Sequence, residues 1–181
     1  MSLLAESLVE EWLNRNGYFT IRGARFGVRE MDLLAVRQGK SGLEARHIEV
    51  QVSTNPVAYI SPLTAVQARA LGKSKGSAWS RPRDVIEAAV SAWVEKKFNS
   101  PAKVKARNKA WPGLLWSLEL VHGSVRYPEE LRLICAHGIK TTSFHSVLDS
   151  LCNDEAVAHK GGAGTDIAEI LAYYVRYQSA N

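Results

Sequence analysis

Two segments rich in β-forming residues lie close together near the start of the 181-residue chain. Residues 30–37 (EMDLLAVR) and residues 46–53 (RHIEVQVS) are separated by a short loop rich in Gly, Ser and Lys. Two such segments joined by a short loop predict a β-hairpin. Within the second segment, residues 47–52 alternate between polar and apolar, which predicts one apolar and one polar strand face. Any fold for this chain must therefore accommodate a hairpin with one polar side.

Helical and strand patterns alternate along the rest of the chain. The expected helices span residues 2–16, 64–71, 84–98, 128–138, 146–151 and 165–177. The expected further strands span residues 18–22, 114–121 and 139–144, while residues 99–113 are expected to form a basic connection and residues 161–164 a linker. This order predicts an α/β fold with a mixed sheet and helices on both faces. The length fits a single domain, residues 1–181, with a basic helical and loop insertion at about residues 57–110.

Charge is distributed unevenly along the sequence. Residues 69–109 contain eleven basic and three acidic side chains, a net charge of +8, so the remainder carries −3 of the total +5. A basic block of this kind suits a polyanionic partner such as nucleic acid, although a solvated surface without a partner has the same composition. The basic residues expected to contact nucleic acid are Lys73, Lys75, Arg81, Arg83, Lys103, Lys105, Arg107 and Lys109.

The sequence contains no sign of a membrane segment or a secretion signal. No apolar run approaches the roughly 20 residues that a spanning helix needs. The apolar N-terminal stretch carries acidic residues where a signal peptide would be basic. A cytoplasmic location without membrane attachment is therefore expected.

Asp32 and Glu49 are the candidate metal ligands. If the two β segments pair, these carboxylates project into one small volume, and hard oxygen donors on rigid strands suit Mg²⁺ or Mn²⁺. A cation held there can polarise a phosphate and lower the pKa of bound water. Gln51, two residues after Glu49, would orient the attacking water as an uncharged hydrogen-bonding group. The alternative is a strand pair with one polar face turned to solvent.

Three blocks of the sequence resemble the PD-(D/E)xK nuclease superfamily, which includes the restriction endonucleases. They are residues 5–21 (AESLVEEWLNRNGYFTI), residues 29–36 (REMDLLAV) and residues 47–52 (HIEVQV). The blocks occur in the order and at the spacing typical of the superfamily, and together they cover under a third of the chain. The resemblance implies a restriction endonuclease-like mixed sheet with an α-β-β-β-α-β core and extra C-terminal helices.

The resemblance also implies roles for particular residues. Asp32 and Glu49 would be the metal ligands, and Glu6 would lie near the site from the first helix. Gln51 stands where the superfamily usually has a lysine, and an amide cannot supply that positive charge. Glu30 is either a further acid of the site or an exposed strand residue.

Two functions are consistent with these features. The first is a metal-dependent endonuclease that hydrolyses phosphodiester bonds in DNA, with Mg²⁺ or Mn²⁺ as cofactor and with a homodimer as one arrangement that cuts both strands. The second is a catalytically inactive nucleic-acid-binding or protein-interaction module on the same fold, which the replacement of lysine by Gln51 favours.

Overall fold

A computed structural model describes residues 2–26, 29–53, 55–153 and 164–179 of the chain. Its centre is one five-stranded sheet with the strand order β1-β2-β3-β4-β5. The strands are β1 (Phe19–Phe26), β2 (Arg29–Gly39), β3 (Gly42–Gln51), β4 (Trp116–His122) and β5 (Ile139–Ser143).

The sheet is mixed, as the sequence predicts. β1, β2 and β3 form an antiparallel meander, and the β2–β3 hairpin closes with Gly39 opposite Gly42. Gly42 has a φ of +132°, a conformation that favours glycine at this tight turn. β3, β4 and β5 run parallel, and helices connect them. The carboxyl ends of β3 and β4 therefore meet at the same edge of the sheet.

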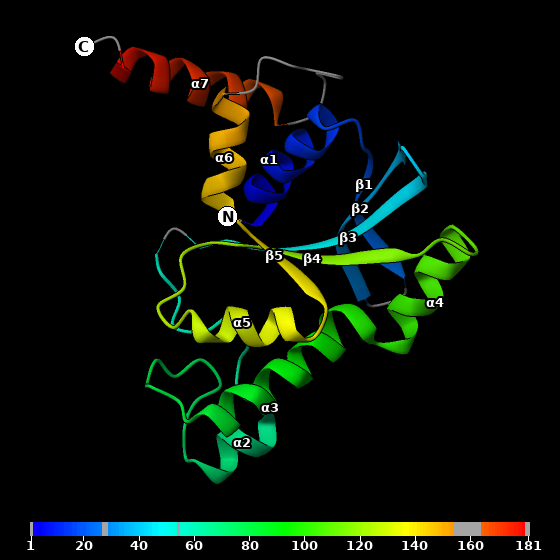
Figure 1. Ribbon diagram of the computed structural model, residues 1–181. Coiled ribbons are helices and arrows are strands. Elements are labelled where there is room, and N and C mark those ends of the chain that lie inside the picture. The colour runs from blue at the N-terminus through cyan, green and yellow to red at the C-terminus, as the bar shows by residue number, and fades with distance from the viewer. Residues whose placement is uncertain (1, 27–28, 54, 154–163, 180–181) are drawn as a thin grey trace.

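Helices cover both faces of the sheet (Figure 1). The helical elements are α1 (Ser2–Arg15), α2 (Ala65–Ala70), α3 (Arg83–Val94), the π-helix η1 (Glu95–Asn99), α4 (Pro101–Ala110), α5 (Glu129–Ala136), α6 (Phe144–Asn153) and α7 (Thr165–Ser179). On one face α1, α6 and α7 pack over a core that includes Leu33, Ile48 and Val121. On the other face α3, η1 and α5 pack over Leu120 and Ile139. No helix within the described ranges is long and apolar enough to cross a membrane.

The polar face of β3 is not turned to solvent. His47 and Glu49 alternate with the apolar residues of this strand, yet they are 0% and 1% exposed. The reason is that η1 and α4 cover them, and α4 occupies the stretch expected to be an irregular basic connection. Pro101 is in the first turn of α4, where proline is favoured because its missing N–H has no partner to lose.

A buried carboxylate fixes the chain that follows β3. Glu130 on α5 is fully buried and accepts hydrogen bonds from the backbone N–H groups of Ile60 and Ser61, each at 2.7 Å, and from the Ser61 hydroxyl. Arg81 donates to the Ser61 carbonyl at 2.8 Å. These contacts hold residues 60–61 against the core that contains Leu120 and Ile139. The first three residues of the expected 161–164 linker lie outside the described residues, and Gly164 directly precedes α7.

Candidate functional site

Asp32 and Glu49 lie next to each other where β2 and β3 stop pairing. The last residue pair of the hairpin at this end is Leu33 and Ile48, and Asp32 and Glu49 are the next residue on each strand. Beyond this pair the Val50 N–H donates to Asp32 Oδ2 at 2.8 Å, so the Asp32 side chain replaces a backbone partner. Both carboxylates are thereby held on rigid strands at the point where the pairing of β2 with β3 ends.

Glu49 is a buried carboxylate surrounded by donors. Its Oε1 accepts from His47 Nε2 at 3.0 Å and from Lys103 Nζ at 2.5 Å, and its Oε2 accepts from Lys97 Nζ at 2.7 Å. Burial alone would raise the pKa of Glu49, but the His47 hydrogen bond and the two ammonium charges outweigh burial and lower the pKa to about 2. Glu49 is therefore ionised at any pH at which the protein would act.

A second chain of hydrogen bonds fixes His47. Arg107 Nη1 donates to His47 Nδ1 at 2.7 Å and to the Phe98 carbonyl at 2.8 Å. Because a guanidinium can only donate, His47 must carry its proton on Nε2, which donates to Glu49. Burial, as the largest cause, lowers the pKa of His47, so the ring is neutral at pH 7. His47 thus orients Glu49 without adding positive charge.

Asp32 has the opposite electrostatic situation. Burial is the main cause that raises its pKa, to about 6, and the neighbouring negative charge of Glu49 adds to the rise. Lys97 lowers the pKa only in part. Within the described part of the chain, Asp32 makes no ion pair of its own. The site therefore contains one carboxylate with ample cationic partners and a second carboxylate with too few.

Two further acids surround this pair. Glu6 on α1 is 7% exposed, and its pKa is raised by burial first and then by the negative charges of Glu30 and Glu49. Glu30 on β2 is exposed and lies 3.3 Å from Arg25 Nε. The structure thus brings Glu6, Glu30, Asp32 and Glu49 within electrostatic reach of one another. In the present arrangement no three metal-binding side chains of the described residues converge tightly enough to hold an ion by themselves.

Gln51 is held by the chain that follows β3. Its Nε2 donates to the Ile60 carbonyl at 3.0 Å, so its Oε1 is left as the group available to a substrate or water. The positive charge near Gln51 is that of Lys97 on η1, which bonds to Glu49. We call the four acids Glu6, Glu30, Asp32 and Glu49, together with the adjoining Gln51 and Lys97, the acid cluster.

Sequence analysis missed the role of Lys97, although a signal is present. Lys97 follows Trp93 by four residues and Val90 by seven, which places it on the buried stripe of the α3 pattern. In the same way Lys103 and Arg107 are four residues apart and share one face of α4. A lysine on a buried stripe signals a buried acidic partner.

Three of the basic residues expected to contact nucleic acid are buried. Lys103, Arg107 and Arg81 are 5%, 6% and 6% exposed, because they bond to Glu49, to His47 and to the Ser61 carbonyl. The prediction that these three residues contact nucleic acid from the surface is therefore wrong. The exposed members of that set are Lys73, Lys75, Arg83, Lys105 and Lys109.

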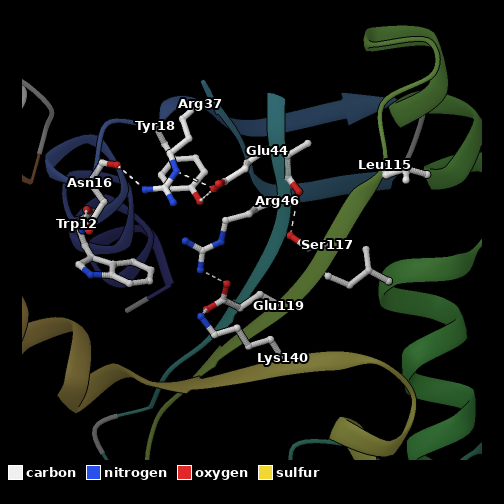
Figure 2. A pocket seen from close by; sticks show the side chains of 12 residues that line it. Trp12, Asn16, Tyr18, Arg37, Glu44, Arg46, Leu115, Ser117, Glu119 and Lys140 are labelled. Atoms are coloured by element: carbon white, nitrogen blue, oxygen red, sulfur yellow. Dashed lines mark hydrogen bonds and ion pairs between the residues drawn. The ribbon is translucent and has the colours of Figure 1, made fainter. Parts of the chain in front are cut away.

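A pocket of about 540 Å³ lies on the face of the sheet opposite to His47 and Glu49; Figure 2 shows the residues that line it. Arg46 alternates with His47 on β3 and therefore points the other way, where it pairs with Glu119 and lies over the Trp12 ring. Arg37 pairs with Glu44 at 2.7 Å. Since these guanidinium groups are already neutralised by carboxylates of the pocket, its size does not make it the better candidate.

Comparisons with known proteins leave the family open. No protein-family profile and no curated protein matches the sequence. Among solved structures, the chain is similar to a crystal structure of a protein of unknown function, AF1548, with 14% sequence identity and a TM-score of 0.46. The match covers 83% of this chain and 66% of AF1548, so this chain spans slightly less than two thirds of the length of AF1548.

Proposed function

We propose that the protein is a metal-dependent nuclease that hydrolyses phosphodiester bonds in DNA and has the restriction endonuclease-like arrangement of the PD-(D/E)xK superfamily. The observation that carries the proposal is the meeting of Asp32 and Glu49 with the Lys97 ammonium. Lys97 supplies, from a different element, the positive charge that is missing at Gln51. Carboxylates and a lysine at one point are the groups that phosphodiester hydrolysis requires.

The donor set fits a divalent cation such as Mg²⁺ or Mn²⁺. Asp32 is short of positive charge, as its pKa of about 6 indicates, and a bound cation would relieve its repulsion from Glu49. Each carboxylate oxygen has two lone pairs, so Glu49 Oε2 retains one beside its bond to Lys97. A cation held by Asp32 and Glu49 would supply Lewis-acid charge at the phosphate.

The chain's own groups divide the remaining tasks. Lys97 is placed to neutralise charge that develops on the phosphate, since its side chain is about one third exposed and its ammonium contacts Glu49. Gln51 Oε1 is placed to accept a hydrogen bond from the attacking water and so to orient it. Glu6 and Glu30 add negative charge that favours cation binding. The exposed lysines and arginines would hold the DNA backbone.

Nicking of supercoiled plasmid tests this proposal. Purified protein should nick the plasmid with Mg²⁺ or Mn²⁺ but not with EDTA. Asp32→Ala and Lys97→Met should each lower the rate on the order of 10²-fold or more, because each removes charge from the reacting centre. Asp149→Ala changes an exposed residue outside both the acid cluster and the basic set expected to contact DNA, and should retain the rate. Nicking that survives both site substitutions in folded protein would refute the proposal.

A non-catalytic nucleic-acid-binding module is the second candidate. The observation that favours it is the complete set of protein donors on Glu49, together with the uncharged Gln51. Such a module would bind DNA in EDTA, with an affinity that falls steeply as salt rises. Metal-dependent nicking by the wild-type protein would exclude this candidate.

A further inference from the structure

A separate pocket opens directly beside the acid cluster. It has a volume of about 400 Å³ and lies between residues 60–65 and the α3–η1 segment. Gln51 and Lys97 line both this pocket and the acid cluster, so a molecule whose phosphate lies at Asp32 and Glu49 would extend into it. The pocket thus shares two side chains with the proposed reaction site.

The lining of this pocket combines positive charge with apolar surface. Lys75, Lys96 and Lys97 line it, and none of the described residues that line it is acidic. Trp93, Leu63 and Ala92 contribute apolar surface. Cations for phosphate, apolar walls for a base and an amide for hydrogen bonding are the groups that recognise a nucleotide, and the volume is in the range of small-ligand pockets.

We propose that this pocket receives one unstacked nucleotide of single-stranded DNA, next to the phosphate at the acid cluster. The inference rests on the proposed function and predicts a preference for single-stranded DNA, including the single-stranded regions that open transiently in a supercoiled plasmid. A base inside a duplex is paired and stacked, and it must leave the stack before it can enter a walled pocket. A single strand does not carry that cost.

Binding in EDTA tests the pocket without relying on cleavage. Fluorescence anisotropy would compare fluorescein-labelled oligo(dT) with a labelled duplex of the same length. Wild-type protein should bind oligo(dT) more tightly than the duplex. Ala92→Phe fills the pocket from the exposed face of α3 and should weaken oligo(dT) binding about tenfold, as expected for the loss of one base contact, with little change for the duplex.

Two further variants make the test specific. Ala88→Phe makes the same change one turn earlier on α3, at an exposed residue that does not line the pocket, and should leave binding unchanged. Lys96→Glu should weaken oligo(dT) binding as Ala92→Phe does, since it places a negative charge in the pocket. If both pocket variants bind oligo(dT) like the wild type, or if the wild type prefers the duplex or binds neither probe, the inference is overturned.

The outcome is separable from that of the nuclease proposal. Selective loss of oligo(dT) binding in Ala92→Phe, in a wild-type protein that never cuts DNA, would retain the pocket and refute the nuclease. Metal-dependent cutting that Ala92→Phe and Lys96→Glu leave unchanged on single-stranded DNA would retain the nuclease and refute the pocket.

Discussion

Two neighbouring carboxylates acquire opposite pKa shifts because of where three cationic side chains lie. Burial would raise the pKa of Glu49, but the His47 hydrogen bond and the direct contacts of Lys97 and Lys103 lower it to about 2. Asp32 is buried next to the negative charge of Glu49, and its hydrogen bond from the Val50 N–H offsets this only in part, so its pKa rises to about 6. Arg107 acts one step further away, by fixing the tautomer of His47. The two acids therefore affect stability in opposite directions.

Asp32→Asn should stabilise the folded protein above pH 6 while abolishing cleavage. The folded pKa of Asp32 exceeds its ordinary value of 3.8, so the folded state retains a proton that the unfolded chain loses between about 3.8 and 6. Stability falls as pH rises through this window, and asparagine removes that fall. Urea unfolding at pH 4 and pH 7.5 should show a gain on the order of 1–2 kcal/mol at the higher pH only.

Glu49→Gln is the matched contrast in the same experiment. The pKa of Glu49 is lowered from 4.5 to about 2, so its stabilisation is present above about pH 4.5 and is lost as pH falls towards 2. Its removal leaves the Lys103 ammonium buried without a counter-charge, which costs about 3–5 kcal/mol. Equal effects of the two substitutions at pH 7.5 would contradict the electrostatic account.

At the residue scale, the sequence indicates the acids of the site and not its cations. The alternation in residues 47–52 and the hairpin pattern are local, and they are sufficient to bring Asp32 beside Glu49. The partners of Glu49 and His47 come from 48, 54 and 60 residues away. Helical periodicity places Lys97 on a buried stripe but does not specify which acid it reaches, and α4 has no apolar stripe, so Lys103 and Arg107 were expected on the surface. The catalytic and metal-binding roles themselves remain predictions.

At the scale of elements, the chain after β3 depends on α5. Glu130 satisfies two backbone N–H groups that have no strand or helix partner, and Ile60 in turn accepts from Gln51. Burial is the main cause that raises the pKa of Glu130, and the Ser61 and Ile60 hydrogen bonds oppose it in part. A carboxylate on one helix therefore determines the position of an amide at the end of a strand.

Glu130→Ala should destabilise the protein by roughly 2–4 kcal/mol, because it leaves buried backbone donors without an acceptor. Thermal or urea unfolding measures this loss. Glu129→Ala, the neighbouring exposed acid in the same helical turn, serves as the control and should change stability by less than about 0.5 kcal/mol. Similar losses in both variants would indicate a helix-terminus effect in place of the buried network.

Most elements could be predicted from apolar periodicity, and α4 shows why one could not. Its residues, PAKVKARNKA, have no apolar stripe, and its buried side chains include Lys103 and Arg107. A helix that buries charged groups is stabilised by their tertiary partners, and those lie on β3. The end of the α3 pattern likewise continues as η1, where the wider π-turn carries Lys97 to Glu49.

At the scale of the whole molecule, α7 presents apolar side chains to solvent. Ile170 and Tyr173 are 66% and 67% exposed. Exposed apolar surface on a helix at the edge of the fold (Figure 1) is a feature of protein interfaces. We predict that two copies of the chain pair through this surface to form a homodimer.

Sedimentation equilibrium at micromolar concentration should show a dimer of the wild-type protein. Tyr173→Glu should shift the population to monomer, because it places a charge within the apolar contact. Arg176→Glu also changes the charge of an exposed residue of α7 and should have a smaller effect than Tyr173→Glu. A wild-type protein that is monomeric throughout the concentration series would contradict the prediction.

The pairing pattern of the sheet has a consequence for the order in which the chain folds. β1, β2 and β3 pair with their neighbours in sequence, whereas β3 and β4 meet only after α2, α3, η1 and α4 have been synthesised. Local pairings close small loops and form early, and the parallel pairing must wait. The emerging N-terminal half therefore holds Asp32 and Glu49 before Lys97 and Lys103 exist. Glu49 therefore gains its cationic partners Lys97 and Lys103 only when η1 and α4 pack against β3. On this folding order, we expect the burial of Glu49 to accompany the joining of the N-terminal strands to the rest of the domain.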